Sequence, residues 1–160
     1  MGVDASVYCD CYEKGRVRKP PPQPELVYVD AFGQRCLKWD DPRADQIGFN
    51  LWLTEACEHG PMGEMVSHRL GNAATIGFLR ELLAETPERF PVLLAKVVYD
   101  GVHAGDSLSV DDVERLCPEI DRLRGIHSHD KSDEDRIRDF ERQMSDLTEA
   151  ARRVQKPIVF

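Results

Sequence analysis

The segment RKPPPQP, residues 18–24, holds four prolines within five positions and constrains the fold more than any other stretch of the chain. Proline lacks a backbone N–H and has a fixed φ, so the run fits neither a helix interior nor a central strand. We expect an extended strut that crosses the surface between two strands. The run also fits the Arg-x-x-Pro-x-x-Pro pattern that SH3-type grooves bind, which is the alternative interpretation.

Short strands are expected on both sides of this strut. Apolar side chains alternate with polar ones from Val3 to Cys11, which is typical of a strand with one buried face. The segments ELVYVD (25–30) and QRCLKW (34–39) predict a hairpin. The apolar C-terminal segment 157–160 is expected to dock on the same protein's sheet, although insertion into a partner is an alternative.

Helical patterns dominate the second half of the chain. Asn72 is expected to cap a helix that begins at residue 73, and Ser109 with Asp112 resembles a capping box. Pro118 is expected to kink or split the helix that follows. Ser132 is expected to cap the last helix, whose apolar residues alternate at spacings of three and four: Ile137, Phe140, Met144, Leu147, Ala151 and Val154. This stripe is expected to pack on the other helices, and dimerisation through it is the alternative.

The sequences of two apolar segments do not distinguish a strand from a helix. Residues 47–57 and 92–99 have the length and composition of a buried strand, but a buried helix would look the same. With the secondary structure of these two segments left open, the order of predicted strands and helices indicates one α+β domain over residues 1–160. It would have a β-rich part at 1–60 with a small antiparallel sheet, then a predominantly helical part at 61–160 with four to five helices.

The chain is acidic, with a formal net charge of −8, so binding to a phosphate backbone is disfavoured. Residues 104–155 carry most of the excess. We therefore expect a non-catalytic binding protein, such as an inhibitor or immunity-type factor, that neutralises a basic protein partner. The expected contact residues are Asp106, Asp111, Asp112 and Glu114. Solubility alone is the simpler interpretation of the charge.

We expect a cytoplasmic protein with reduced thiols. The N-terminus lacks the basic and apolar regions of a secretory signal, and no apolar run reaches the length of a membrane span. Five cysteines fit a disulfide framework poorly. Metal binding and simple burial are the two remaining explanations for them. The sequence does not determine the oligomeric state.

Two pairs of soft ligands predict a metal site. Cys9 and Cys11 are two residues apart, as are Cys57 and His59, and residues at i and i+2 of a strand point to the same side. Together the four side chains would form a closed structural zinc site with three thiolates and one imidazole. The alternative is that the cysteines are buried apolar residues, and a variant site would use His68 instead of one of the four.

A second constellation suggests a small metal-dependent enzyme. The glycine-flanked loop around His103 and Asp106 offers a general base pair, with His68 as a further ligand. No nucleophile elbow, P-loop, dinucleotide fingerprint or His-Glu-x-x-His motif accompanies it. The segment with His127 and His129 precedes the last helix and is interpreted as a linker. The enzyme is therefore the alternative to the binding protein.

Overall fold

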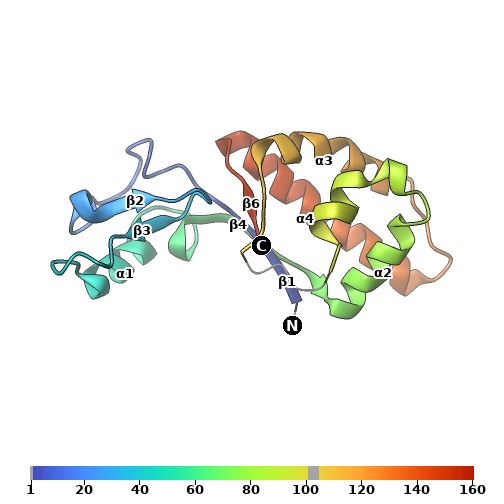
Figure 1. The fold of residues 1–160 in the computed structure, drawn as a ribbon, viewed down its shortest axis with the longest axis horizontal. Coiled ribbons are helices and arrows are strands. Elements are labelled where there is room, and N and C mark those ends of the chain that lie inside the picture. Colours follow the sequence, from blue (N-terminus) through green and yellow to red (C-terminus); the bar gives the residue numbers. More distant parts are fainter. Residues whose placement is uncertain (1, 101–104) are drawn as a thin grey trace.

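The computed structural model describes residues 2–100 and 105–160. Figure 1 shows an elongated molecule with two lobes that meet near one end of strand β1. The smaller lobe holds strands β2 and β3 with helix α1, and the larger lobe holds helices α2, α3 and α4 against a sheet. This arrangement confirms the predicted α+β class with a small antiparallel sheet.

The sheet of the larger lobe has four strands in the order β4-β1-β6-β5. Strand β1 (Gly2–Tyr8) pairs antiparallel with β4 (Glu64–Asn72) on one side and with β6 (Ile158–Val159) on the other. Strand β5 (Ser107–Leu108) pairs with β6 and completes the sheet. The chain's last residues thus dock on the chain's own sheet, as the sequence predicts.

Strand β1 lies between β4 and β6 in this sheet, and its side chains alternate in burial. Val3, Ala5 and Val7 are at most 1% exposed, whereas Asp4 between them is exposed. The buried face of the strand contacts α2 and α4, which cover the sheet. The alternation that predicts the strand therefore also determines which face of the strand packs against the helices.

Helices α2 (Ala73–Leu83), α3 (Val110–Leu123) and α4 (Lys131–Val154) form the rest of the larger lobe. Asn72 caps α2, and Ser109 with Asp112 forms the predicted capping box of α3. The apolar stripe of α4 faces α3 and the sheet, so it is used within the chain. Its members Ile137, Phe140, Met144, Leu147 and Ala151 are at most 1% exposed.

Two helix details differ from the sequence prediction. Pro118 lies inside α3 without dividing it. Helix α4 is capped by Asp130 and not by Ser132, because the Asp130 carboxylate accepts hydrogen bonds from the backbone N–H groups of Ser132 and Asp133. A carboxylate at the N-cap also interacts favourably with the helix dipole, which a hydroxyl does not.

The segment that the sequence leaves open at 92–99 is largely helical. It includes the π-helix η4 (Leu93–Val97), which follows a helical turn at Pro91 and Val92. The buried carboxylate of Glu119 on α3 accepts hydrogen bonds from the backbone N–H groups of Val92 and Leu93, both at 2.9 Å. A side chain 26 residues away therefore caps this helical segment, and no local pattern could signal it.

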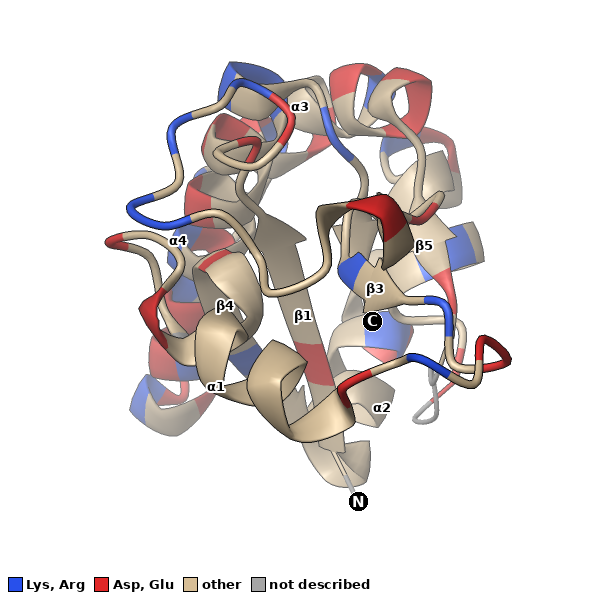
Figure 2. Cartoon of the chain, turned by 90° about the vertical axis from the view of Figure 1, so that its left-hand side faces the viewer, with Lys and Arg blue, Asp and Glu red and all other residues tan. Residues whose placement is uncertain are grey.

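The smaller lobe has its own apolar core. Strands β2 (Val27–Val29) and β3 (Arg35–Leu37) form the predicted hairpin, preceded by a 3₁₀ turn at Pro24–Leu26. Helix α1 (Gln46–Glu55) packs on it. The core consists of Leu26, Val27, Leu37, Phe49, Trp52, Leu53 and Ala56. Figure 2 looks at this lobe end-on and shows α1 at the front with almost no charged residues.

The proline segment is a surface strut, as expected. The indole N–H of Trp52 on α1 donates a hydrogen bond to the carbonyl oxygen of Lys19 at 2.8 Å, at the start of the strut. The Gln23 side chain donates to the carbonyl oxygen of Arg43 at 2.6 Å and accepts from the N–H of Asp45 at 2.7 Å. Both contacts fasten the strut to the smaller lobe.

Both parts of the predicted division at residue 60 contain helix and strand. Helix α1 lies within the part expected to be β-rich, and strand β4 lies within the part expected to be helical. Strand β4 is an edge strand, and few of its residues are fully buried, so its sequence lacks a clear alternation. Helix α1 is apolar on both faces, which removes the helical period from its sequence.

Within residues 2–100 and 105–160, no helix has the length and apolar character needed to cross a membrane.

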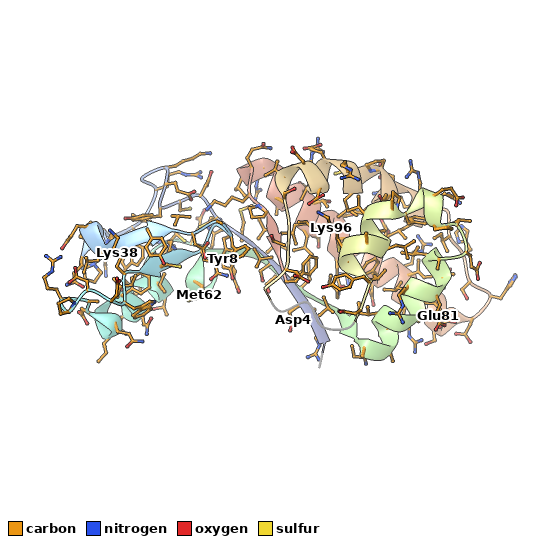
Figure 3. The ribbon with its side chains drawn as sticks, in the orientation of Figure 1. Asp4, Tyr8, Lys38, Met62, Glu81 and Lys96 are labelled. Atoms are coloured by element: carbon orange, nitrogen blue, oxygen red, sulfur yellow. The ribbon has the colours of Figure 1, made fainter. Side chains whose placement is uncertain are left out.

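The side chains drawn in Figure 3 fill both lobes, and Tyr8, the last residue of β1, lies where the lobes meet.

A buried lysine joins the C-terminal segment to the smaller lobe. Lys156 is 6% exposed, and its ammonium group donates hydrogen bonds to the carbonyl oxygens of Cys9 (2.9 Å) and Gly33 (3.2 Å). It also pairs with the Glu13 carboxylate at 2.6 Å. One side chain thus connects the residues after α4, the loop after β1 and the β2–β3 turn.

We expect Lys156→Met to lower the free energy of unfolding by about 2 kcal/mol, because two buried carbonyl oxygens would lose their donor. Urea denaturation followed by circular dichroism measures this loss. Lys38→Met is the matched control, since Lys38 is exposed. Equal stability of the two variants would contradict the role given to Lys156.

Candidate metal centre

The four residues predicted as ligands come together where the two lobes meet. Cys9 and Cys11 follow the end of β1, and Cys57 and His59 follow the end of α1. Their ligand atoms all lie within 4.8 Å of one another. The three cysteines are 5–6% exposed, and His59 is half-buried. This group can hold a metal ion.

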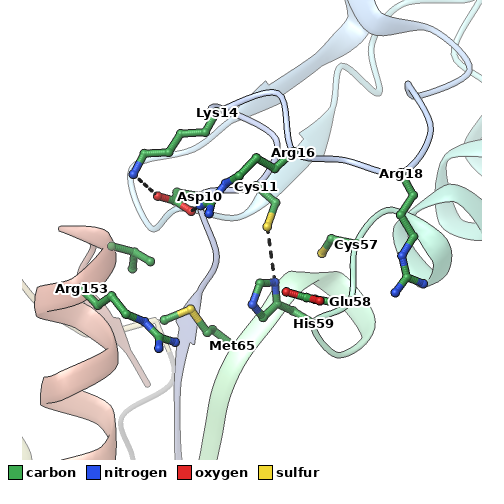
Figure 4. Close-up of a pocket in the computed structure, with 11 residues that line it drawn as sticks. Asp10, Cys11, Lys14, Arg16, Arg18, Cys57, Glu58, His59, Met65 and Arg153 are labelled. Carbon is green, nitrogen blue, oxygen red and sulfur yellow. Dashed lines mark hydrogen bonds and ion pairs between the residues drawn. The ribbon is translucent and has the colours of Figure 1, made fainter.

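The distances within the group are those of thiols that are not oxidised. The Cys9 and Cys57 sulfur atoms are 3.7 Å apart, far beyond the length of a disulfide bond. The Cys11 sulfur is 3.5 Å from Nδ1 of His59. Figure 4 shows this second contact at the centre of a pocket.

Tight turns, and not a strand, aim the first two ligands. Strand β1 ends at Tyr8, so the expected strand geometry for Cys9 and Cys11 is wrong. The Arg16 N–H closes a turn on the carbonyl oxygen of Cys11 at 2.7 Å, within a segment that contains Gly15 with a φ of +64°. The turn folds the chain back on Cys11 directly after the first ligand pair, which sequence spacing alone does not specify.

The second pair of ligands is also followed by a turn. Gly60 and Gly63 are joined by a backbone hydrogen bond of 2.9 Å, and Met62 and Gly63 have φ values of +67° and +82°. The Cys9 N–H donates to the carbonyl oxygen of Gly63 at 2.8 Å. The two ligand-bearing loops are therefore hydrogen-bonded to each other directly.

Arg35 is a buried cation beside the thiols. Its side chain is stacked 5.2 Å from the ring centroid of Trp52, and Nη1 lies 3.9 Å from the Cys57 sulfur. Nη2 is buried and has no hydrogen-bond partner among the described residues. A side chain at position 63 would collide with this guanidinium, so the glycine there makes room for it.

Charge explains why a cation is buried here. A divalent ion bound by three thiolates and one neutral imidazole carries a net charge of −1, and an arginine next to a thiolate balances it. The sequence does contain a signal for Arg35, although the motifs considered above do not include it. Arg35 and Leu37 lie on the same face of β3, so a charged residue occupies a position with the period of the core.

The ionisation of Cys9 also depends on a bound cation. Burial raises the pKa of the Cys9 thiol to about 12, although a backbone hydrogen bond from Cys11 opposes the rise. Without a metal ion the thiol is protonated at neutral pH, and a metal ion must displace that proton.

The other predicted site residues lie apart from this group. His68 on β4 pairs with Asp146 at 3.1 Å and is not one of the four ligands. His103 lies outside the described residues, so the loop proposed as a catalytic site is described only in part. Asp106 is hydrogen-bonded to the Tyr99 hydroxyl, and the bond raises the pKa of Tyr99 to about 12. Cys36 and Cys117 also lie outside the group.

The expected contact surface for a basic partner is largely engaged within the chain. Asp112 is buried, pairs with Lys96 at 2.6 Å and completes the α3 capping box. Glu114 pairs with Arg152 at 2.9 Å. Asp112 therefore serves as a capping residue of α3, whereas Asp111 is exposed.

No protein-family model, curated protein or solved structure matches the chain. The geometry of the group and of the surfaces around it therefore carries the functional argument.

We expect Arg35→Met to weaken binding of a divalent metal roughly ten- to hundredfold, because the balancing charge is lost while the apolar stem is kept. Competition with a chromogenic chelator measures the affinity. Arg43→Met is the control, since Arg43 is exposed and pairs only with Asp41 in the same loop. Unchanged affinity in a folded Arg35→Met protein would show that the guanidinium has no part in the site.

Metal affinity should fall with decreasing pH. Since the pKa of Cys9 is raised, binding releases at least one proton, and the affinity should drop at least about a hundredfold between roughly pH 8 and pH 6. The same chelator competition, repeated across this range, provides the measurement. A flat profile would mean that no thiol proton is displaced.

Proposed function

We propose that this chain is a non-catalytic binding protein whose smaller lobe is held in place by a structural zinc ion. The ligands are Cys9, Cys11, Cys57 and His59. The observation that carries the proposal is the closed set of four protein ligand atoms within 4.8 Å of one another. Four protein ligands leave no coordination position for a substrate, which is the mark of a structural zinc site.

Zinc fits the donor set and two of the separations between ligand atoms. In a tetrahedral site with zinc bonds of about 2.3 Å to sulfur and about 2.0 Å to nitrogen, two sulfur atoms lie about 3.8 Å apart and a sulfur lies about 3.5 Å from a nitrogen. The corresponding separations here are 3.7 Å and 3.5 Å. Thiolate and imidazole are also the donors that zinc prefers among protein ligands.

The outer face of α1 supports the binding role. Of the six large apolar side chains that are exposed among the described residues, Tyr28, Trp39, Ile47, Leu51 and Met62 belong to the metal-held lobe or its loops. Ile47 and Leu51 are 76% and 65% exposed and lie one turn apart on α1. Since α1 is also apolar on its packed face, its outer face is a natural contact for a partner protein.

Binding of a basic partner through carboxylates has less support than binding of a partner through the apolar face of α1. Two of the carboxylates expected to contact it, Asp112 and Glu114, are engaged with cations of the same chain. Asp106 is hydrogen-bonded to the Tyr99 hydroxyl, and Asp111 is exposed. An inhibitor or immunity-type role against such a partner remains a prediction. The metal-dependent enzyme has no supporting observation among the described residues, since His68 and Asp106 have other partners.

Untagged protein should contain about one zinc ion per chain. We expect Cys9→Ser and His59→Ala to lose the metal and to unfold at a lower temperature, because metal binding and folding of the loops are coupled. Cys117→Ser and His127→Ala are the matched controls, since both residues lie outside the group. Metal content by mass spectrometry and thermal unfolding provide the readouts. A well-folded, metal-free wild-type protein would refute the proposal.

The apolar face makes a separate prediction. We expect the double variant Ile47→Glu/Leu51→Glu to keep its zinc and its melting temperature but to lose the proteins that cross-link to the wild-type chain in cells. Tyr99→Ser, which changes an exposed aromatic residue of the larger lobe, is the control. An unchanged set of cross-linked proteins in the double variant would exclude this face as the contact surface.

A further inference from the structure

A pocket of about 540 Å³ opens beside the four-ligand group, and its lining is basic. Cys11, Cys57 and His59 form part of its wall. Four cationic side chains line it as well: Lys14, Arg16, Arg18 and Arg153. Only two carboxylates accompany them, Asp10 and Glu58, so the lining has a formal charge of 4 − 2 = +2 with His59 neutral. This is the opposite sign to the net charge of the chain.

Two of the cations share one carboxylate, which neutralises one of their two charges. Asp10 is 5% exposed, pairs with Lys14 at 2.5 Å and forms an ion pair with Arg16. Asp10 therefore holds Lys14 and Arg16 together on one wall of the pocket.

The other two cations are not neutralised in this way. Arg18 and Arg153 are exposed, and neither side chain has an ion-pair partner among the described residues. Figure 4 shows them on opposite sides of the pocket, with Glu58 and His59 between. Arg18 lies in the loop after β1, and Arg153 lies at the C-terminal end of α4, so widely separated segments contribute to one pocket.

Backbone hydrogen bonds fix the pocket walls. The Arg18 N–H donates to the carbonyl oxygen of Ala56 at 2.7 Å, which ties the basic loop to the end of α1. The Arg16 N–H closes the turn that carries Cys11. The basic side chains therefore extend from backbone that is held in place before any ligand arrives, which lowers the entropic cost of binding.

We propose that this pocket binds the phosphate group of a small phosphate monoester. Arginine guanidinium groups match the geometry of phosphate oxygens through paired hydrogen bonds. A monoester dianion carries two negative charges, which equals the excess of the lining, whereas a carboxylate carries one. The volume of the pocket leaves room for the organic part of the ligand.

Titration of isotopically labelled protein with phenyl phosphate, followed by NMR, tests this proposal. Saturable shifts should appear for the backbone amides of residues 14–18 and 57–59. Arg18→Gln and Arg153→Gln should each weaken the affinity about tenfold, since each removes one charged donor. Arg142→Gln is the control, because Arg142 lies on α4 outside the pocket lining and pairs with Asp139.

Glu58→Gln provides a test in the opposite direction. Removing this carboxylate takes away repulsion in the pocket, so affinity for phenyl phosphate should rise severalfold. A merely misfolded variant could not produce such a gain. Acetate and sodium chloride at matched ionic strength are the comparison ligands. Shifts of equal size with either one would overturn the proposal, as would equal affinities in the Arg18, Arg153 and Arg142 variants.

The phosphate proposal and the zinc proposal fail separately. The zinc content of the protein is measured before phenyl phosphate is added and again at the end of the titration. Phosphate binding without zinc would refute the proposed function and leave the pocket, whereas zinc without phosphate binding would refute only the pocket.

Discussion

The structure depends on the meeting of two loops that are almost fifty residues apart in the chain. The first loop leaves the central strand of the larger lobe, and the second leaves the helix of the smaller lobe. Between them lie buried sulfur atoms, a half-buried imidazole and a buried guanidinium that balances their charge on metal binding. Small apolar cores give little stability by themselves, so a metal ion bound by this group would add stability that the smaller lobe's short hairpin and single helix do not supply.

Other contacts converge on the same place. The Lys156 ammonium binds the backbone of the first loop and of the β2–β3 turn, so the C-terminal segment also depends on the loop geometry. The basic pocket has the ligand group as part of its wall, and the outward apolar face of α1 is carried by the lobe that the group positions. Both proposed binding surfaces would therefore respond to loss of the metal.

Sequence patterns predicted the α+β class, the hairpin and the α3 capping box, because each rests on local periodicity. Residue type singled out the four side chains that the structure groups together, Cys9, Cys11, Cys57 and His59. They missed what depends on distant partners. Glu119 makes the segment at 92–97 helical from another helix, and β4 lacks alternation because it lies at an edge. The roles of Arg35 and the pocket cations can be recognised only once the turns place these residues beside the thiols.

X-ray absorption at the zinc edge on the purified full chain tests the central claim most directly, because it reports the donor atoms around the metal. The account predicts a first shell of three sulfur atoms at about 2.3 Å and one nitrogen at about 2.0 Å, without a water ligand. A shell dominated by oxygen, or one with an open position filled by water, would contradict a closed structural site.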